Sequence, residues 1–512
     1  MKTLVIDGEN LNLAKVWAWA HTDTGTLSLS EKARKRVKES HAYVSRLAKG
    51  KTPVYGVNTG FGLLSDVAIP KNKLAQLQIN LLRSHSVGVG NPLSLAEAKA
   101  AMLLRTNTLA RGNSGASLAL IEKLLEVQNA GIISWIPEQG SVGACGDLAP
   151  LAHMALLLVG EGRCWYQGAW QDSAKALKKA RIKPHKLGPK EGLSLINGTQ
   201  IMTAIGALVI YEAIALAKVA DIAGALSLDA FRGTAVAFDK RIHAVRPHSE
   251  QATVAANLRL LLKGSKIANS HKDCGKVQDP YSFRCMPQVH GAARRLIDNC
   301  VPVLETEMNS ATDNPLVFVR GGKGEILSGG NFHGEYVAMI MDTAAIALSE
   351  LANISDLRIQ KLINPAISGL PAFLTIDPGL NSGMMIVQVA SASLVSENKV
   401  LSHPASVDSI PTSADKEDHV SMGVHAARKA RQILSNLRHV LAMELLCGSQ
   451  AVDLLRPLLS SKPLEALITE IRSVVPPITE DRIFHHDIMA IEGLLRGGKV
   501  LAAVESATGT LE

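Results

Sequence analysis

One glycine-rich stretch of the chain combines residue types that allow unusual backbone chemistry: Gly140-Ser-Val-Gly-Ala-Cys-Gly-Asp-Leu-Ala-Pro-Leu-Ala-His-Met154. Glycine lacks a Cβ and therefore permits sharply folded backbone that other residues avoid. Between the small residues Ala144 and Gly146, Cys145 carries a thiol on its Cβ. A thiol has a pKa of about 8.5, against about 15.7 for water, so its sulfur is a better leaving group than hydroxide. The alternative is an ordinary small buried thiol, a common fate of free cysteine.

Five further blocks contain residues suited to chemistry on an amino acid. Arginine binds a carboxylate through paired hydrogen bonds, and a buried tyrosine can exchange a proton. The blocks are Tyr55-Gly-Val-Asn-Thr-Gly-Phe-Gly62, Asn197-Gly-Thr-Gln200, Gln278-Asp-Pro-Tyr-Ser-Phe-Arg284, Gly329-Gly-Asn-Phe-His333 and Lys416-Glu-Asp-His-Val-Ser-Met422. Each block alone would be a weak signal, whereas all five in this order around the glycine-rich stretch make coincidence negligible.

Together these blocks resemble the MIO-dependent aromatic amino-acid lyases, from about Tyr55 to Met422. In that family an Ala-Ser-Gly tripeptide cyclises into 4-methylideneimidazol-5-one (MIO). The resemblance implies that the backbone nitrogen of Gly146 attacks the carbonyl carbon of Ala144. This chain departs from the family pattern at Cys145, where serine is usual. We expect Cys145 still to yield the methylidene, with loss of hydrogen sulfide, so that MIO forms autocatalytically without an exogenous cofactor or a metal.

Elimination of ammonia from an amino acid makes three demands: a better leaving group, removal of a β-proton and a hold on the carboxylate. Arg284 matches the carboxylate clamp, because a guanidinium pairs with a carboxylate in a planar fork. Tyr55 matches the family base, which requires a pKa lowered by nearby positive or donor groups. Tyr281 matches a second active-site tyrosine that assists the departing amine. The alternatives are a surface ion pair for Arg284 and a packing role for Tyr55.

Three other residues are assigned by the same resemblance. Asn197 and Gln278 match amides that bind near the ring oxygen or the substrate carboxylate, where donors increase the electrophilicity of the ring. Phe332 matches an aromatic side chain beside the ring, although a lone phenylalanine is more often part of the core.

The side-chain preference is expected from Ser84-His85 and Glu417. The first pair occupies the family's selectivity position, where histidine-type members carry Ser-His, and Glu417 resembles the glutamate that those members place against the substrate imidazole. A carboxylate and an imidazole together can recognise both ring nitrogens, which a phenyl ring would leave unpaired. A core His85 and a surface Glu417 are the alternatives.

The resemblance therefore implies a carbon–nitrogen lyase that eliminates ammonia from L-histidine to give trans-urocanate, as histidine ammonia-lyases do. Within the same family, the rivals are a phenylalanine or tyrosine ammonia-lyase, an aminomutase and an amine eliminase without MIO. A catalytically silent binding homologue is the rival if Cys145 does not cyclise. The resemblance also implies a homotetramer whose active sites are shared between subunits.

Composition excludes several other classes. The 54 basic and 46 acidic residues are spread along 512 positions, and aromatic residues form 4% of the chain, so nucleic acid is not an expected partner. The six cysteines include no CxxC pair, and the N-terminus lacks the apolar run of a signal peptide, which favours the cytoplasm. The most apolar segment, 201–217, is interrupted by Glu212 and is shorter than a membrane span of about 20 residues.

The elements that must position these residues are expected to be mainly α-helices. Periodicity and helix-forming composition predict helices over 94–109, 116–130, 192–231, 288–310, 334–363, 382–401 and 419–446, with a strand candidate over 164–170. We predict a mainly α fold with an N-terminal α-rich domain, residues 1–197, that carries the MIO loop. A C-terminal bundle of long helices, residues 198–512, is expected to form the oligomer core.

Overall fold

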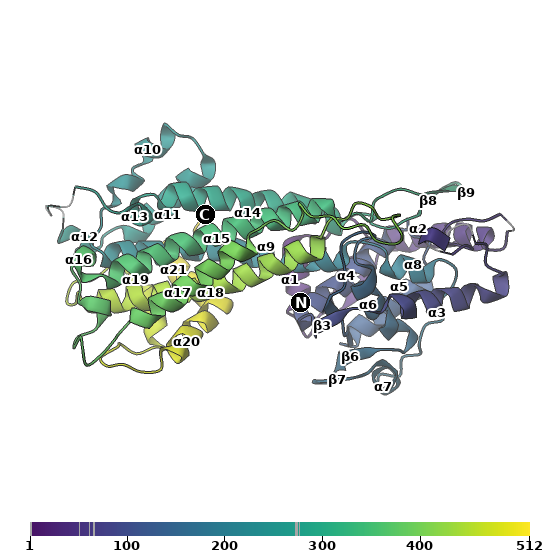
Figure 1. Ribbon diagram of the computed structural model, residues 1–512, viewed down its shortest axis with the longest axis horizontal. Coiled ribbons are helices and arrows are strands. Elements are labelled where there is room, and N and C mark those ends of the chain that lie inside the picture. Colours follow the sequence, from purple (N-terminus) through teal and green to yellow (C-terminus); the bar gives the residue numbers. More distant parts are fainter. Residues whose placement is uncertain (1–2, 51, 61, 65–66, 272–274, 276) are drawn as a thin grey trace. The chain divides into compact units, whose positions relative to one another are not determined.

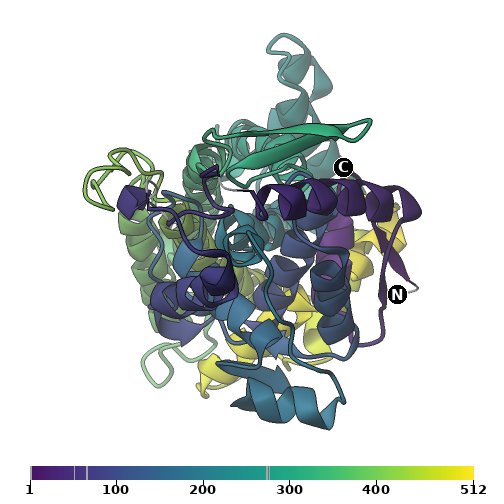
Figure 2. The same cartoon turned by 90° about the vertical axis from the view of Figure 1, so that its right-hand side faces the viewer.

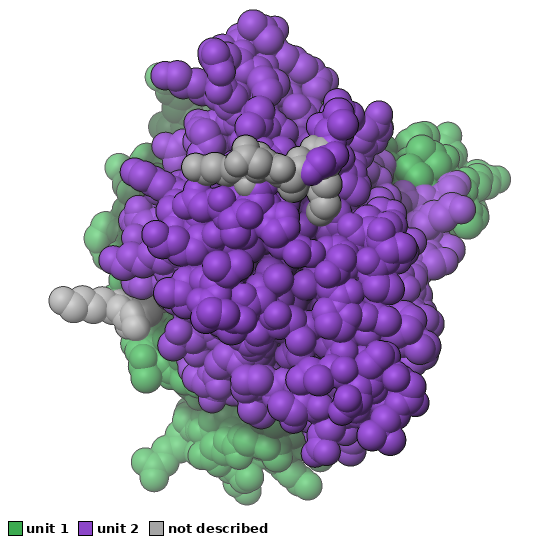
Figure 3. Space-filling model, turned by 90° about the vertical axis from the view of Figure 1, so that its left-hand side faces the viewer, with its two compact units in different colours: residues 1–211, 300–342, 404–428 green, residues 212–299, 343–403, 429–512 purple. Residues whose placement is uncertain are grey.

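The computed structural model describes residues 3–50, 52–60, 62–64, 67–271, 275 and 277–512. Phe61 of the first block lies outside these residues. The chain forms two compact units, each built from three segments: unit 1 contains 1–211, 300–342 and 404–428, and unit 2 contains 212–299, 343–403 and 429–512 (Figure 3). The predicted division at 197/198 falls inside unit 1, because the first segment of this unit continues to residue 211.

The predicted mainly α fold is confirmed (Figure 1). Among its described residues, unit 1 contains eight α-helices that lie entirely within it: α1 (Leu13–Ala20), α2 (Glu31–Leu47), α3 (Leu74–His85), α4 (Leu95–Ala110), α5 (Leu118–Asn129), α6 (Leu148–Leu156), α7 (Ser173–Lys179) and α8 (Glu191–Ile196). In α4, the Ser94 side chain accepts from the Glu97 backbone while Glu97 bonds back to Ser94, a capping box that explains where this helix begins. Helix α5 ends just before Gly131, whose φ of 71° stops the helix.

The strands of unit 1 are short and form four small sheets. Strands β1 (Leu4–Ile6) and β2 (Leu27–Leu29) are parallel, whereas β3 (Val89–Pro92) and β5 (Pro137–Gln139) are antiparallel. The predicted strand at 164–170 is a hairpin of β6 (Arg163–Tyr166) and β7 (Ala169–Asp172), which β4 (Ile133–Ser134) extends. The hairpin of β8 (Leu316–Arg320) and β9 (Lys323–Leu327) lies beside α2, where Val44 and Val317 share a core (Figure 2).

Unit 2 is helical. Its own helices are α10 (Lys240–Ala244), α11 (Ser249–Leu262), α12 (Lys266–Asn269), α13 (Tyr281–Arg284), α16 (Pro365–Ser368), α17 (Met385–Leu401), α19 (Lys462–Arg472), α20 (Phe484–Arg496) and α21 (Lys499–Thr508). Its core includes a fully buried ion pair in which Arg358 donates to both oxygens of Glu444, at 2.5 and 2.8 Å.

Four long helices have residues in both units: α9 (Gln200–Ala230), α14 (Met286–Met308), α15 (Glu335–Ile363) and α18 (Gly423–Asp453). By length and composition alone, α9 and α15 could cross a membrane. However, 78% and 61% of their most apolar stretches are buried inside the protein. They are therefore core helices.

The predicted helix over 192–231 is interrupted. Helix α8 ends at Ile196 and α9 begins at Gln200, with Asn197 extended (φ −89°, ψ 114°) and Gly198 at φ 143°. The buried Arg105 of α4 holds this turn by donating to the carbonyl oxygens of Ser194 and Asn197, each at 3.0 Å. Because of this interruption, Asn197 is not helical, and the backbone N–H and C=O of Gly198 are free to bond with the glycine-rich loop.

Candidate active site

The glycine-rich loop runs from Gly140 to Asp147, between β5 and α6, and its backbone requires glycine at one central position. Gly146 has a φ of 68°, and a Cβ on it would lie 2.1 Å from the carbonyl oxygen of Gly198. Two hydrogen bonds fasten this approach, from Asp147 N to Gly198 O at 2.7 Å and from Gly198 N to Cys145 O at 3.3 Å. Because Gly146 has no Cβ, the loop can adopt the tight backbone fold that ring closure across Ala144-Cys145-Gly146 demands.

Asp147 anchors the end of the loop, a role that the sequence analysis missed. Its side chain is fully buried and accepts from the backbone N–H groups of Ile201, at 2.8 Å, and Met202, at 3.1 Å, in the first turn of α9. A carboxylate there complements the positive end of the helix. Burial nevertheless raises the pKa of Asp147 to about 7, against the lowering effect of the two N–H groups.

The other side of the loop packs against residues 420–422. Ala144 shares a small hydrophobic cluster with Val420 and Met422, and the Met422 backbone donates to the carbonyl of Val142 at 2.8 Å. A Cβ on Gly143 would lie 2.1 Å from Ser421 Oγ. The loop is therefore held on one face by the α8–α9 turn and on the other by the segment that carries Glu417.

Cys145 and Glu417 are in direct contact although 272 residues separate them. The thiol donates to Glu417 Oε1 at 2.9 Å, and the other carboxylate oxygen accepts from Thr412 Oγ1 at 2.7 Å. Burial raises the pKa of the Cys145 thiol above its ordinary value, and the adjacent carboxylate raises it further. Before any cyclisation, residue 145 is thus a neutral thiol and not a free thiolate.

Tyr55 and His85 lie close enough to Glu417 to feel its charge. Burial lowers the pKa of His85, which the charge of Glu417 partly opposes, so the imidazole is neutral near pH 7. His85 ends α3, with its Nδ1 3.0 Å from Ser84 Oγ. Unit 1 thus places Tyr55, His85 and Cys145 near Glu417.

The electrostatics of Tyr55 differ from the expectation. Burial raises the pKa of its hydroxyl, the backbone N–H of Gly62 opposes this, and the charges of Glu417 and Asp313 raise it further. Burial is the main cause of the raised pKa and the nearby acidic groups add to it, so the described residues of unit 1 do not provide the lowering that a base requires.

Asn197 is buried at the end of α8 and uses its amide differently from the expectation. Its Nδ2 donates to the carbonyl of Asn314 at 3.0 Å, while its Oδ1 is buried without a hydrogen-bond partner among the described residues. The unpartnered atom is therefore an acceptor, which suits an N–H of a bound amine better than a carboxylate.

Phe332 lies in the turn between β9 and α15 and is half-buried. Asn314 holds this turn, because its Oδ1 accepts from the Gly329 backbone at 2.7 Å. The same asparagine therefore contacts both the turn of Phe332 and the side chain of Asn197.

The remaining three assigned residues belong to unit 2. Gln278 is exposed, and Tyr281 and Arg284 begin and end the short helix α13. The Arg284 guanidinium carbon lies 4.5 Å from the centroid of the Tyr281 ring, and its Nε is buried without a hydrogen-bond partner among the described residues. A guanidinium with an unused donor beside an aromatic ring is suited to a carboxylate ligand.

The chain is similar along nearly its whole length to known lyases. The family model described as "Aromatic amino acid lyase" matches residues 11–473. Histidine ammonia-lyase of Koribacter versatilis is 53% identical over 517 residues, covering 99% of this chain and 100% of the relative. The crystal structure of histidine ammonia-lyase from Trypanosoma cruzi matches with a TM-score of 0.91 and 44% identity, covering 99% of this chain and 95% of that one.

A tyrosine aminomutase from Streptomyces globisporus shares the fold, with a TM-score of 0.93 and 38% identity over 100% of both chains. The fold alone therefore does not distinguish elimination from amine migration. The family matches confirm the resemblance inferred from the six sequence blocks. The chain belongs to the aromatic amino acid lyase family.

Proposed function

We propose that the chain is a histidine ammonia-lyase that converts L-histidine into trans-urocanate and ammonia. The observation that carries the proposal is the contact of Glu417 with Cys145, in a loop whose Gly146 is pressed against Gly198. The tripeptide that would form the electrophile thus lies against the carboxylate that would bind an imidazole.

We infer that MIO forms from Ala144, Cys145 and Gly146. Ring closure joins the Gly146 nitrogen to the Ala144 carbonyl carbon with loss of water, and Cys145 then loses hydrogen sulfide across its Cα–Cβ bond. When formed, the group supplies an electrophile for the substrate amine. Gly146 and Asp147 keep the loop folded through their contacts with the α8–α9 turn.

The preference for histidine follows from the surroundings of Glu417. Loss of the Cys145 thiol frees Oε1, the carboxylate oxygen that the thiol occupies, while Thr412 still holds Oε2. The freed oxygen can then accept from a substrate imidazole N–H, and the neutral His85 can take part in binding the ring. A phenyl side chain would leave these partly buried polar groups unpaired.

The other residues are proposed to act on the carboxylate, the amine and the β-proton of the substrate. Arg284 and Gln278 bind the carboxylate, Asn197 Oδ1 accepts from the amine, Tyr281 assists its departure and Phe332 lies against the ring. Tyr55 removes the β-proton. Because burial and, to a smaller extent, acidic neighbours in unit 1 raise the pKa of Tyr55, we propose that other parts of the assembly supply the positive groups that make it a base.

We propose a homotetramer with active sites shared between subunits. Support comes from apolar side chains that the single chain leaves exposed on α17, where Ile386, Val389 and Val400 are 64%, 54% and 74% exposed. Tyr281, assigned to the site, is 71% exposed in the single chain. Exposed apolar patches of this kind mark interfaces. Light scattering after size-exclusion chromatography tests the stoichiometry, and a monomer that turns over histidine at the full rate contradicts the shared site.

Intact mass and urocanate absorbance together test the reaction. The purified chain should weigh about 52 mass units less than its translated sequence, one water plus one hydrogen sulfide. Cys145→Ser should show a deficit of about 36, two waters, with activity at least as high, because it restores the usual tripeptide. Cys145→Ala should remain folded and lose turnover.

The substrate preference is tested by assays of histidine, phenylalanine and tyrosine side by side. Histidine should be preferred over phenylalanine and tyrosine by about two orders of magnitude or more. Comparable turnover of phenylalanine would refute the histidine assignment and leave the lyase family intact. An unmodified mass together with full histidine turnover would instead favour the eliminase without MIO.

A further inference from the structure

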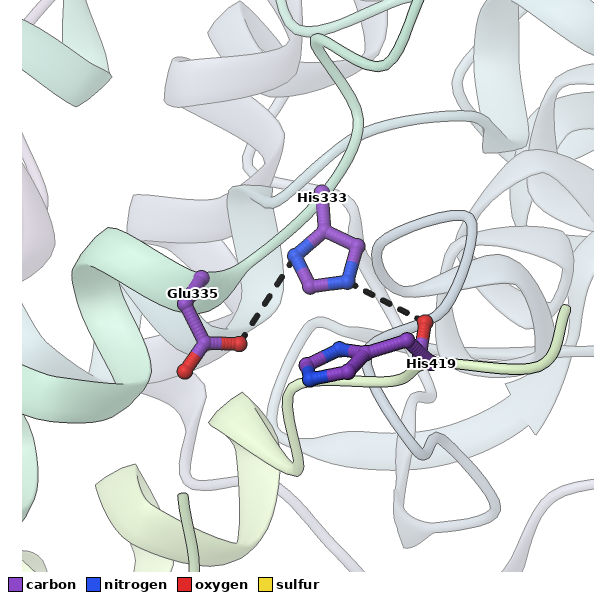
Figure 4. Close-up of side chains that lie close together, drawn as sticks. All are labelled: His333, Glu335 and His419. Carbon is purple, nitrogen blue, oxygen red and sulfur yellow. Dashed lines mark hydrogen bonds and ion pairs between the residues drawn. The ribbon is translucent and has the colours of Figure 1, made fainter. Parts of the chain in front are cut away.

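A cluster of three potential metal ligands lies beside the candidate active site in unit 1. His333 and Glu335 flank the start of α15, and His419 precedes α18 (Figure 4). One ligand atom from each residue lies within 4.8 Å of the others. None of the three has been assigned a part in the elimination of ammonia.

The hydrogen bonding of His333 leaves one of its ring nitrogens facing the carboxylate. Its Nε2 lies 3.2 Å from the carbonyl oxygen of His419, which can only accept, so Nε2 carries the hydrogen. In a neutral imidazole Nδ1 then has the lone pair, and it lies 3.8 Å from Glu335 Oε2. A metal-binding histidine ordinarily donates its other N–H to a carbonyl or carboxylate in this way.

One carboxylate oxygen of Glu335 is suited to binding a cation. Glu335 Oε2 is buried and has no hydrogen-bond partner among the described residues. A positive species between these two acceptors, either a proton on Nδ1 or a metal ion, stabilises the pair. A proton alone would form an ion pair of His333 and Glu335 and would leave the adjacent His419 ring unexplained, whereas a metal uses all three.

The backbone that carries the ligands is closely packed. A Cβ on Gly334 would lie 2.5 Å from Met202 Sδ and 2.8 Å from Ser421 Oγ. The turn before α15 therefore packs closely against Met202 and against the segment of His419, and a larger residue at 334 would have to displace these side chains. Two ligands of a tetrahedral zinc are about 3.4 Å apart, for bonds of about 2.1 Å. The 3.8 Å pair thus needs only a small contraction.

We propose that His333, Glu335 and His419 bind one divalent transition-metal ion, with zinc as the best match. Two imidazoles and one carboxylate suit zinc and leave a fourth position for water. His419 lies two residues after Glu417, so the bound ion fastens the Glu417 segment to the turn that carries Phe332. The ion acts as a clip beside the active site and does not replace the protein-derived electrophile.

Zinc titration of the untagged full-length protein by isothermal calorimetry tests the site directly. Wild type should bind one zinc ion per chain with micromolar or tighter affinity. Glu335→Gln and His419→Gln should each lose at least about tenfold in affinity, since changes even outside the ligand shell of a metal cost 10–100-fold. Binding of cobalt should give visible absorption typical of a tetrahedral site in wild type and not in the variants. His21→Gln, an exposed histidine at the end of α1, is the control and should bind as wild type does.

Hydrogen exchange tests the clip. Zinc should slow exchange over residues 404–422 in wild type and in His21→Gln, and not in Glu335→Gln. Circular dichroism of each variant verifies that the fold is retained. Failure of wild type to bind zinc, or equal binding by wild type and both ligand variants, would overturn the proposal. Because these measurements require no turnover, their result is independent of whether histidine is the substrate.

Discussion

Replacement of Gly146 by alanine tests how much the close contact between the loop and Gly198 contributes to stability, beyond the backbone strain of a non-glycine residue at positive φ. Gly146 has a φ of 68°, a conformation that costs an L-residue about 1–2 kcal/mol. The added Cβ would also lie 2.1 Å from the Gly198 oxygen, so the loop must move away from the α8–α9 turn. That movement breaks the two hydrogen bonds between Gly198 and residues 145 and 147, at about 1 kcal/mol each.

Gly168 is the matched control because it has a similar φ of 82° and nothing within 4 Å of the position of a Cβ. Gly168→Ala should lower the free energy of unfolding by about 1–2 kcal/mol, the strain alone. Gly146→Ala should lower it by about 3–4 kcal/mol, strain plus two hydrogen bonds. Urea denaturation followed by circular dichroism measures both values.

The two variants should also differ in mass. Gly168→Ala should retain the deficit of about 52 mass units, while Gly146→Ala should show the unmodified mass, because its nitrogen is displaced from the Ala144 carbonyl carbon. If Gly146→Ala is as stable as Gly168→Ala and carries the full deficit, the close approach to Gly198 is not what positions the loop for cyclisation.

Three further perturbations test other parts of the molecule. Arg284→Lys keeps the charge and loses the planar fork, so kcat/KM for histidine should fall about tenfold or more, and unchanged steady-state kinetics would remove this residue from the site. Lys190→Met leaves Asp313, its fully buried partner at 2.7 Å, unpaired, which should cost about 3–5 kcal/mol in urea denaturation. The exposed Lys32→Met should change stability by less than about 1 kcal/mol. Because burial raises the pKa of Asp147 to about 7 from 3.8, the folded state binds more protons between these values, so this residue's stabilisation is lost as the pH rises through that window. Asp147→Asn should flatten the corresponding part of the stability curve, and an unchanged slope would contradict the raised pKa.

Several elements and assignments could be predicted from the sequence because their signals are local. The capping box of Ser94 and Glu97 spans four residues, and the predicted helices 94–109 and 334–363 agree with α4 and α15 to within a residue or two. The helix over 192–231 was less well predicted, because its apolar composition continues through Asn197 and Gly198. Arg105, which directly follows the apolar run 100–104 of α4, was the signal that polar backbone groups had to be satisfied nearby.

The sequence by itself determined the chemical inventory: a tripeptide with a leaving group, an acidic residue and a histidine for an imidazole, and glycines where the backbone folds sharply. Only the tertiary structure decided which of these groups meet. Cys145 reaches Glu417 across 272 residues, and burial of Tyr55, together with its acidic neighbours, raises a pKa that a base needs lowered. Helical periodicity and capping depend on neighbours within a few residues, whereas hydrogen-bond partners, burial and local charge depend on how distant segments pack.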